Sequence, residues 1–172
     1  VALSGDFDRE EMLRLIESRF GEWKPAELAR QREWPLPGPK GTERIEVKYE
    51  AEEQVMIAWP TVAESHPDAD AITVMDMVMD NSEAGILNLR LNQAQRVKRA
   101  GSGPRLHNDA GDWIIFAAPK KDQTLEQAEA LLLEMVAALK AGEFAEDDIR
   151  AVITDFEVSE KMKLESYDSR VS

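Results

Sequence analysis

The stretch DWIIFAAPKKDQTLEQAEALLLEMVAALKAG, residues 112–142, decides the fold class. Its first eight residues are rich in aromatic and β-branched side chains, which is typical of a strand. Apolar residues then recur at helical spacing, with Thr124 and Gln127 placed as a capping box and Gly142 as the stop. The predicted buried stripe of this helix is Leu125, Ala128, Leu131, Leu132, Met135, Val136 and Leu139. A strand followed by a long amphipathic helix predicts a sheet covered by helices.

Other strand patterns lie upstream of this stretch. Residues 99–107 form a predicted strand, and the turn residues 108–111 join it to residues 112–118 as a hairpin. Residues 44–50 alternate, with Ile45, Val47 and Tyr49 predicted to face inward. The apolar run VMIAW, residues 55–59, reads as a central strand, and residues 1–4 as the end of a strand. The sheet is therefore predicted to be mostly antiparallel.

Four further helices are predicted around these strands. The first is capped by Asp8, with Glu11 reaching back to it, and ends at Gly21. The second opens with a capping box at Ser65 and Asp68, the third covers residues 84–97, and the last begins near Glu146. Their predicted buried positions are Met12, Leu13, Ile16 and Phe20; Ile72, Met75, Val78 and Met79; Ile86, Leu87, Leu91, Ala94 and Val97; and Ile149, Val152, Ile153 and Phe156.

The element order β-α-ββ-αα-ββ-αα predicts an α+β fold, a two-layer sandwich with the helices packed on one face of the sheet. We expect residues 1–172 to form a single domain, with a proline-rich strap over residues 24–42. The sequence begins without methionine inside an apolar run and stops inside a helical pattern. We therefore expect it to be excised from a longer polypeptide.

Composition excludes several classes of function. The chain has 34 acidic and 21 basic residues and a net charge of −13, which argues against binding to nucleic acid or anionic lipid. It contains no cysteine, so thiol catalysis, disulfides and thiolate zinc sites are excluded. No apolar run approaches the roughly 20 residues that span a bilayer, so no membrane insertion is expected.

No residue qualifies as a catalytic, cofactor-binding or metal-binding residue. A zinc site needs three or four converging ligands, and His66 and His107 each lie in a turn pattern without partners at a metal-binding spacing. Residues 101–103 (Gly-Ser-Gly) resemble a phosphate loop superficially, but they lack a third glycine and a following helix. We interpret them as the flexible start of a strand.

The remaining conspicuous residues have structural interpretations. The acidic clusters at residues 50–53 and 143–148 lack the order of a calcium loop and are read as a solvated surface and a helix N-terminus. Three methionines, Met75, Met77 and Met79, suggest a pliable peptide-binding surface, but core packing is the default for them. Trp59 and Trp113 lie in strong strands and are expected in the core.

The order of motifs resembles the pitrilysin/insulinase family of zinc metallopeptidases, the inverzincins. Residues 1–23, VALSGDFDREEMLRLIESRFGEW, look like the segment that opens the second domain of a family half. Residues 81–91 resemble the family's N-x-x-A-G-x-L-x-x-x-L helix. DWIIFAAPK, followed by residues 123–149, resembles the family's strand, long helix and linking turn. The likeness covers nearly the whole chain.

The resemblance implies a role within a larger peptidase. The H-x-x-E-H helix and the zinc would belong to an upstream catalytic domain, so this second domain would hold no cofactor and hydrolyse nothing alone. It would brace the catalytic domain and, with the opposing half of the same peptidase, form the wall of a chamber that holds a peptide substrate. A bacterial periplasm or cell envelope is a guess at the compartment.

One departure from the family leaves two alternatives open. Active C-terminal halves carry an Arg and a Tyr that contact substrate, and the matching positions here are near Gln95 and Ser102. No substrate contact is therefore assigned. The chain could come from an N-terminal half, or from an inactive homologue that acts as a peptide-binding or assembly scaffold.

Overall fold

The structure is a computed structural model that describes residues 2–27, 38–81 and 84–170. The chain divides into two compact units, which we describe separately. The larger unit is residues 36–156, and the smaller unit combines residues 1–35 with residues 157–172. Most of the predicted strap falls on residues 28–37, which lie outside the described residues.

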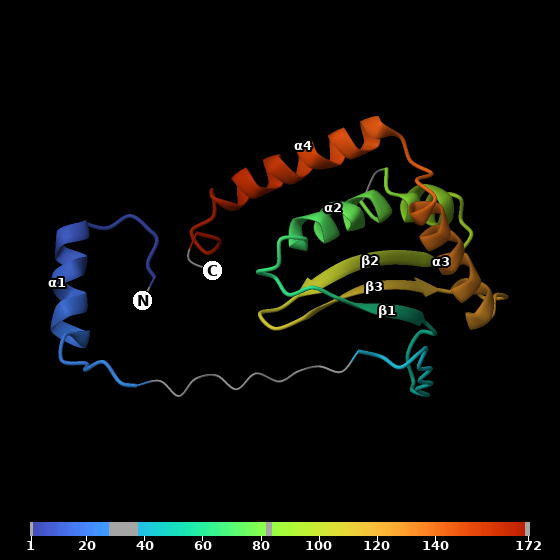
Figure 1. Cartoon of the computed structure of the whole chain (residues 1–172). Helices are drawn as coiled ribbons and strands as arrows, with labels where there is room; N and C mark the ends of the chain where they lie inside the picture. Colours follow the sequence, from blue (N-terminus) through green and yellow to red (C-terminus); the bar gives the residue numbers. More distant parts are fainter. Residues whose placement is uncertain (1, 28–37, 82–83, 171–172) are drawn as a thin grey trace. The chain divides into compact units, whose positions relative to one another are not determined.

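The larger unit is built on a three-stranded antiparallel sheet (Figure 1). Its strands are β1 (Val55–Thr61), β2 (Arg99–Leu106) and β3 (Gly111–Ala118), in the order β1-β3-β2. Strands β2 and β3 form the predicted hairpin, and β1 pairs with the other side of β3, with Trp59 opposite Trp113. The central strand is therefore β3. The prediction that residues 55–59 are central was wrong: β1 alternates between half-buried and exposed residues, as an edge strand with one covered face does.

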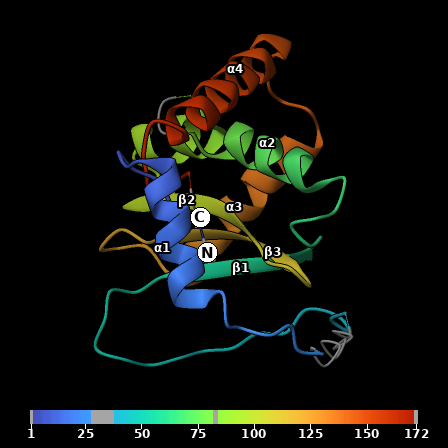
Figure 2. The ribbon, with the colours of Figure 1, turned by 90° about the vertical axis from the view of Figure 1, so that its left-hand side faces the viewer.

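Helices cover one face of this sheet. Helix α2 (Ala69–Met79) and the short π-helix η1 (Asn88–Gln93) pack against β2, and α3 (Leu125–Lys140) packs against β3 and β1. Figures 1 and 2 show α2 running along the sheet. The last helix is α4 (Glu146–Lys163). The predicted α+β class, with helices packed on an antiparallel sheet, is confirmed.

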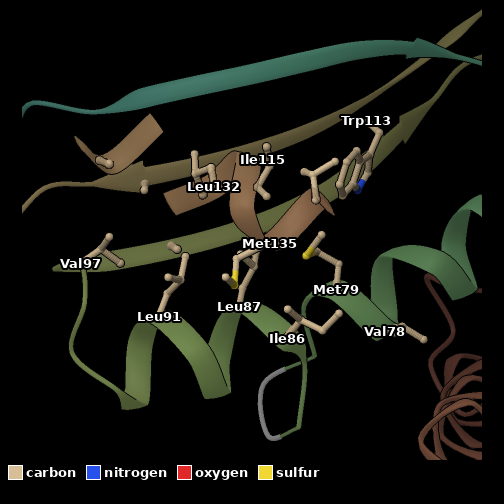
Figure 3. Close-up of a cluster of buried hydrophobic side chains, with 14 of the residues drawn as sticks. Val78, Met79, Ile86, Leu87, Leu91, Val97, Trp113, Ile115, Leu132 and Met135 are labelled. Atoms are coloured by element: carbon tan, nitrogen blue, oxygen red, sulfur yellow. The ribbon is translucent and has the colours of Figure 1, made fainter. Parts of the chain in front are cut away.

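One apolar core lies between the sheet and the helices (Figure 3). Leu132 and Met135 of α3, Leu87 and Leu91 of the η1 region, and Ile115 of β3 are fully buried in it. Trp59 is half-buried and stacks on the buried Trp113, with the ring centroids 5.3 Å apart. The buried members of the core are Val78, Met79, Ile86, Leu87, Leu91, Val97, Ala100, Trp113, Ile115, Ala117, Ala128, Leu132, Met135, Val136 and Val152.

The ends of α3 are fixed by the predicted signals. Thr124 and Gln127 form a reciprocal capping box, in which each side chain accepts a hydrogen bond from the other's backbone amide. At the other end Gly142 has φ of 70°, and the amides of Gly142 and Glu143 donate to the carbonyls of Leu139 and Ala138. This is a Schellman motif, which places a glycine where other residues would be strained.

Two predicted strands are absent. Residues 2–4 and 44–50 have no strand structure, and Ile45, Val47 and Tyr49 are 83%, 80% and 85% exposed. Apolar and charged residues do alternate in residues 44–50, but alternation alone does not make a strand. A strand also needs a neighbouring strand with which its backbone forms hydrogen bonds. In the described part of the chain, residues 44–50 have none.

The helix between residues 84 and 97 is shorter than predicted. Residues 86–93 are helical, and the π-helical turns end where the Arg96 amide donates to the Leu91 carbonyl. Ala94 is exposed rather than buried. The Asn92 side chain accepts a hydrogen bond from the Ala100 amide at 2.8 Å and donates one to the Ala100 carbonyl at 3.0 Å. These two bonds hold this region against β2.

The start of α2 also differs from the prediction. Asp68, not Ser65, is the N-cap residue, and its side chain makes no capping bond. The Asp68 amide donates instead to His66 Nδ1 at 3.1 Å, because the preceding residues form tight turns. The capping-box pattern in this segment was therefore misleading. Of the predicted buried positions in α2, Val78 and Met79 are buried and Ile72 and Met75 are half-buried.

In the smaller unit, helix α1 (Arg9–Phe20) has the predicted boundaries. Asp8 accepts a hydrogen bond from the Glu11 amide at 2.7 Å, and Gly21 follows the last turn. Its predicted apolar face is not buried, however, since Leu13 is 45% exposed and Met12 and Ile16 are half-exposed.

In α4 only Val152 is buried, and Ile153 is exposed. No helix in the described residues is long and apolar enough to span a bilayer.

We predict that Leu132→Ala destabilises the fold far more than Glu134→Ala. Leu132 is fully buried, and emptying such a site usually costs about 2–5 kcal/mol. Glu134 is about half exposed and forms an ion pair with Arg96, a contact worth at most about 1 kcal/mol at a surface. Urea unfolding of both variants measures the difference. Equal losses would show that the inward face of α3 is wrongly assigned.

Candidate functional site

Asp76 is the one buried charged or polar side chain in the described part of the chain, at 8% exposure. It lies on α2, three residues before the helix ends, and faces the sheet. Sequence reasoning did not select it. The signal that could have revealed it is an acidic residue among the apolar positions of a helix that is otherwise rich in Ile, Val and Met.

Three elements meet at this carboxylate. Oδ1 of Asp76 accepts hydrogen bonds from Ser102 Oγ of β2 at 2.5 Å and from Trp113 Nε1 of β3 at 2.7 Å. Next to it, Oδ2 of Asp80 accepts from the Ser102 amide at 2.9 Å. We call Asp76, Asp80, Ser102 and Trp113 the Asp76 cluster. It fastens α2 to both strands of the β2–β3 hairpin.

The surroundings raise the pKa of Asp76 above its ordinary value. Burial is the main cause, because it disfavours the charged carboxylate. The hydrogen bonds from Ser102 and Trp113 act in the opposite direction, and the negative charge of Asp80 adds to the rise. Raised carboxyl pKa values occur at functional sites and also in structural networks, so the geometry must decide between them.

The geometry of the Asp76 cluster supports a structural role. A serine nucleophile needs a base that takes its proton and donors that stabilise an oxyanion. Here the carboxylate oxygen that accepts the hydrogen bond from the Ser102 hydroxyl is buried and also accepts one from the Trp113 indole. Neither histidine belongs to the cluster. The arrangement satisfies a buried indole and holds the helix on the sheet.

Both histidines lie in turns, as their sequence contexts predicted. His66 is exposed, and its Nδ1 accepts from the Asp68 amide. His107 is exposed at the β2–β3 turn, where its amide donates to Ala110 and its carbonyl accepts from Glu64. In the described residues no three His, Cys, Asp or Glu side chains come close enough to hold a metal ion.

Residues 101–103 lie inside β2, so the prediction of a strand was correct. Gly101 has a specific reason for being glycine. A Cβ there would meet the Phe116 ring at 2.9 Å and Asp80 Oδ2 at 3.2 Å, whereas a Cβ at Gly103 would meet nothing within 4 Å. Gly101 therefore lets Asp80 reach the Ser102 amide, and close approach rather than flexibility explains it.

The acidic clusters have the structural roles that were predicted. Glu52 forms an ion pair with Lys98, and Glu143 pairs with Arg90 at 2.8 Å. Asp148 accepts from the Ala145 amide and so caps the start of α4. Met79 is buried, and Met75 and Met77 pack against the core, which confirms core packing for all three methionines.

The two positions matched to the family's substrate contacts are occupied by residues with other roles. Gln95 has φ of 52° in the turn after η1, a left-handed conformation that ends the π-helical segment. Ser102 belongs to the Asp76 cluster.

The sheet face that points away from the helices carries an apolar patch, which the Arg105–Asp112 ion pair borders. We call it the open face and define it by Met56, Ala58, Ile114 and Phe116, which the register places side by side on β1 and β3. Met56 is 55% exposed, and Ile114 and Phe116 are half-exposed. The Arg99 guanidinium lies 5.3 Å from the centre of the Phe116 ring, a cation–π contact at the border of this face.

A comparison with protein families matches residues 1–155 to the Peptidase M16 inactive domain. The chain belongs to this family. The resemblance to pitrilysin-like peptidases that the motifs indicated is therefore confirmed, and the chain is a non-catalytic type of peptidase domain. A comparison with curated protein sequences found no match.

Solved structures agree on the fold. Nineteen solved chains match this M16 domain, among them the crystal structure of a protease from Helicobacter pylori. That structure superimposes with a TM-score of 0.73 at 20% sequence identity, over 96% of this chain. The present chain spans 41% of the length of that protein. At this identity the likeness establishes the fold alone.

We predict that Asp76→Asn changes the pH dependence of stability of this M16 domain. The folded-state pKa of Asp76 lies above the ordinary value of 3.8 for an aspartate. The contribution of Asp76 to stability is therefore fully present below pH 3.8 and is lost as the pH rises through the folded-state pKa. Asn keeps an acceptor oxygen but carries no charge. The variant should therefore gain stability relative to the parent as the pH rises from acid to neutral.

Urea unfolding of both proteins across this pH range measures the effect. Ser102→Ala is the matched control, since it removes a hydrogen bond that lowers the pKa of Asp76. In that variant the loss of stability should extend to a higher pH, and be larger in total, than in the parent. Parallel stability curves for the parent and Asp76→Asn would contradict the assignment.

Proposed function

We propose that this M16 domain is the non-catalytic partner of a zinc-dependent catalytic domain in a longer metalloendopeptidase. In this proposal it braces the catalytic domain and forms part of the wall of a chamber that holds a peptide. The zinc and the H-x-x-E-H helix lie in the upstream domain. In this proposal the present chain supplies no zinc ligand.

The open face is the observation that carries the proposal. Met56, Ala58, Ile114 and Phe116 stand together on the exposed face of the sheet and leave apolar surface accessible. The Arg105–Asp112 ion pair and Arg99 lie at the border of this surface. Such a surface suits contact with an unfolded peptide, whose apolar side chains are not buried within its own fold. Chamber walls that hold peptides of varied sequence need this kind of undirected contact.

The bracing role is supported by the smaller unit. Its helix α1 has no buried residue, and the exposed side chains on or beside it include Phe7, Leu13, Leu15 and Trp23. An amphipathic helix with an uncovered apolar face is usually packed against another element. A preceding domain of the same polypeptide would cover it, and the length of the Helicobacter pylori protease leaves room for one in a chain of that kind.

A second candidate is a peptide-binding or assembly scaffold from a family member that lost its activity. Gln95 and Ser102 favour it, because they replace the Arg and Tyr of active C-terminal halves. The absence of that Arg and Tyr fits an N-terminal half of an active enzyme as well. The open face would bind peptide in both cases, and only the longer polypeptide would differ in activity.

We predict that a photo-crosslinking residue at Ala58 captures peptide, whereas one at Ala137 does not. Both alanines are exposed, but Ala58 lies on the open face of β1 and Ala137 on the outer side of α3. The experiment introduces benzoylphenylalanine at each position in the longer polypeptide and adds an unfolded apolar peptide. Mass spectrometry then measures the crosslinked fraction.

Peptide hydrolysis by the same preparations separates the two candidates. Capture at Ala58 with hydrolysis supports the peptidase domain, and capture without hydrolysis supports the scaffold. Equal capture at both positions, or capture at Ala137 alone, would contradict the assignment of the open face as the peptide-holding wall.

A further inference from the structure

A groove lies on the helix side of the larger unit, between the first half of α4 and residues of α2 and η1. Its volume is about 370 Å³, near the lower end of the roughly 300–1,000 Å³ that ligand pockets occupy. Every residue that lines it belongs to the larger unit. Figures 1 and 2 show α2 between this part of α4 and the sheet, so the groove is separate from the open face. We call it the α4 groove.

The floor of the α4 groove is apolar. Val78, Ile86 and Val152 line it and are buried, and Leu89 lines it with 48% of its surface exposed. Helix α4 covers this floor only in part, since Val152 is its single buried residue. Ala151, which also lines the groove, is exposed and presents only a methyl group. The groove therefore offers accessible apolar surface to the apolar part of a ligand.

Acidic side chains surround this floor, and one of them is unused. Arg90 occupies Glu143, because it donates to the Glu143 carboxylate at 2.8 Å and to the Glu143 carbonyl at 3.0 Å. Asp148 accepts from the Ala145 amide at 2.8 Å and caps α4. Asp155 lines the groove and makes no hydrogen bond or ion pair with any described residue. Its carboxylate is therefore free to bind a cationic group.

Helix α4 places this carboxylate beside the apolar floor. Asp148, Val152 and Asp155 are four and three residues apart and so lie on one face of the helix. The free amides of the first turn carry partial positive charge, which disfavours a cation next to Asp148. Asp155 lies about two turns further along, beyond the reach of this effect. A cation in the groove is therefore expected at Asp155.

We propose that the α4 groove binds an arginine side chain of a partner polypeptide. The alkyl part of the arginine lies on the floor formed by Val78, Ile86 and Val152, and the guanidinium donates to the Asp155 carboxylate. A long side chain with an apolar stem and a charged end matches this combination of surfaces. Arginine fits better than lysine, because its planar guanidinium donates two parallel hydrogen bonds to one carboxylate.

Charge selects the partner. The chain has a net charge of −13, so a second copy of it is repelled, whereas a basic segment of another polypeptide is attracted. Arg90 does not oppose this attraction, because Glu143 neutralises it. The inference concerns the helix side of the domain and holds whether or not the open face binds peptide.

Fluorescence anisotropy of a labelled peptide tests the proposal on the full chain. The probe is a fluorescein-labelled pentapeptide with one arginine between two leucines and an alanine at each end. The matched control peptide carries citrulline, which has nearly the same shape as arginine but no charge. At about 0.15 M salt, which screens distant charges, the arginine peptide should bind at least about threefold more tightly than the citrulline peptide.

Three variants locate the binding. Asp155→Asn should lower the affinity for the arginine peptide to that for the citrulline peptide. Asp147→Asn is the matched control: it makes the same change of charge on the same helix, but outside the groove, and should leave both affinities unchanged. Ala151→Phe fills the groove and should abolish binding of both peptides. All three positions are exposed, so the variants should keep the fold, which circular dichroism checks.

Several results would overturn the proposal. No binding of the arginine peptide, or equal affinity for the two peptides, would remove the recognition of arginine. Equal weakening by Asp147→Asn and Asp155→Asn would show diffuse attraction to an acidic protein. Binding that survives Ala151→Phe would place the peptide outside the α4 groove.

Discussion

The burial of one face of β3 is the constraint on which the larger unit depends. Trp113, Ile115 and Ala117 lie on that face, and α2, η1 and α3 are each held where they cover it or the strands beside it. The central strand has a neighbour on both sides, so its backbone is satisfied while its apolar residues form the floor of the core. Elements far from this strand are correspondingly more exposed.

The Asp76 cluster adds direction to this apolar contact. Apolar burial alone would allow α2 to slide over the sheet, since the hydrophobic effect has no preferred geometry. Hydrogen bonds from Ser102 and Trp113 to one carboxylate oxygen fix the helix to both strands of the hairpin. The carboxyl group of Asp76 thereby holds α2 in place on the hairpin. Such a structural role suits a domain whose family is described as inactive.

Local signals were readable from the sequence, and long-range partners were not. Thr124, Gln127 and Gly142 act within a few residues of their own position, so the ends of α3 were predicted correctly. The central place of β3 depends on which strands become its neighbours, and an apolar run such as residues 55–59 does not contain that information. Asp76 was missed for the same reason, because its partners lie 26 and 37 residues away.

The central claim is that this chain supports catalysis performed elsewhere, and peptide hydrolysis by the purified chain tests it most directly. The assay is run on the chain alone and after mixing with the catalytic domain that we propose to lie upstream of it. The account predicts no hydrolysis by the chain alone, and hydrolysis by the mixture that exceeds that of the upstream domain by itself. Hydrolysis by the chain alone, abolished by Ser102→Ala, would contradict the account, because it would make the Asp76 cluster a catalytic site.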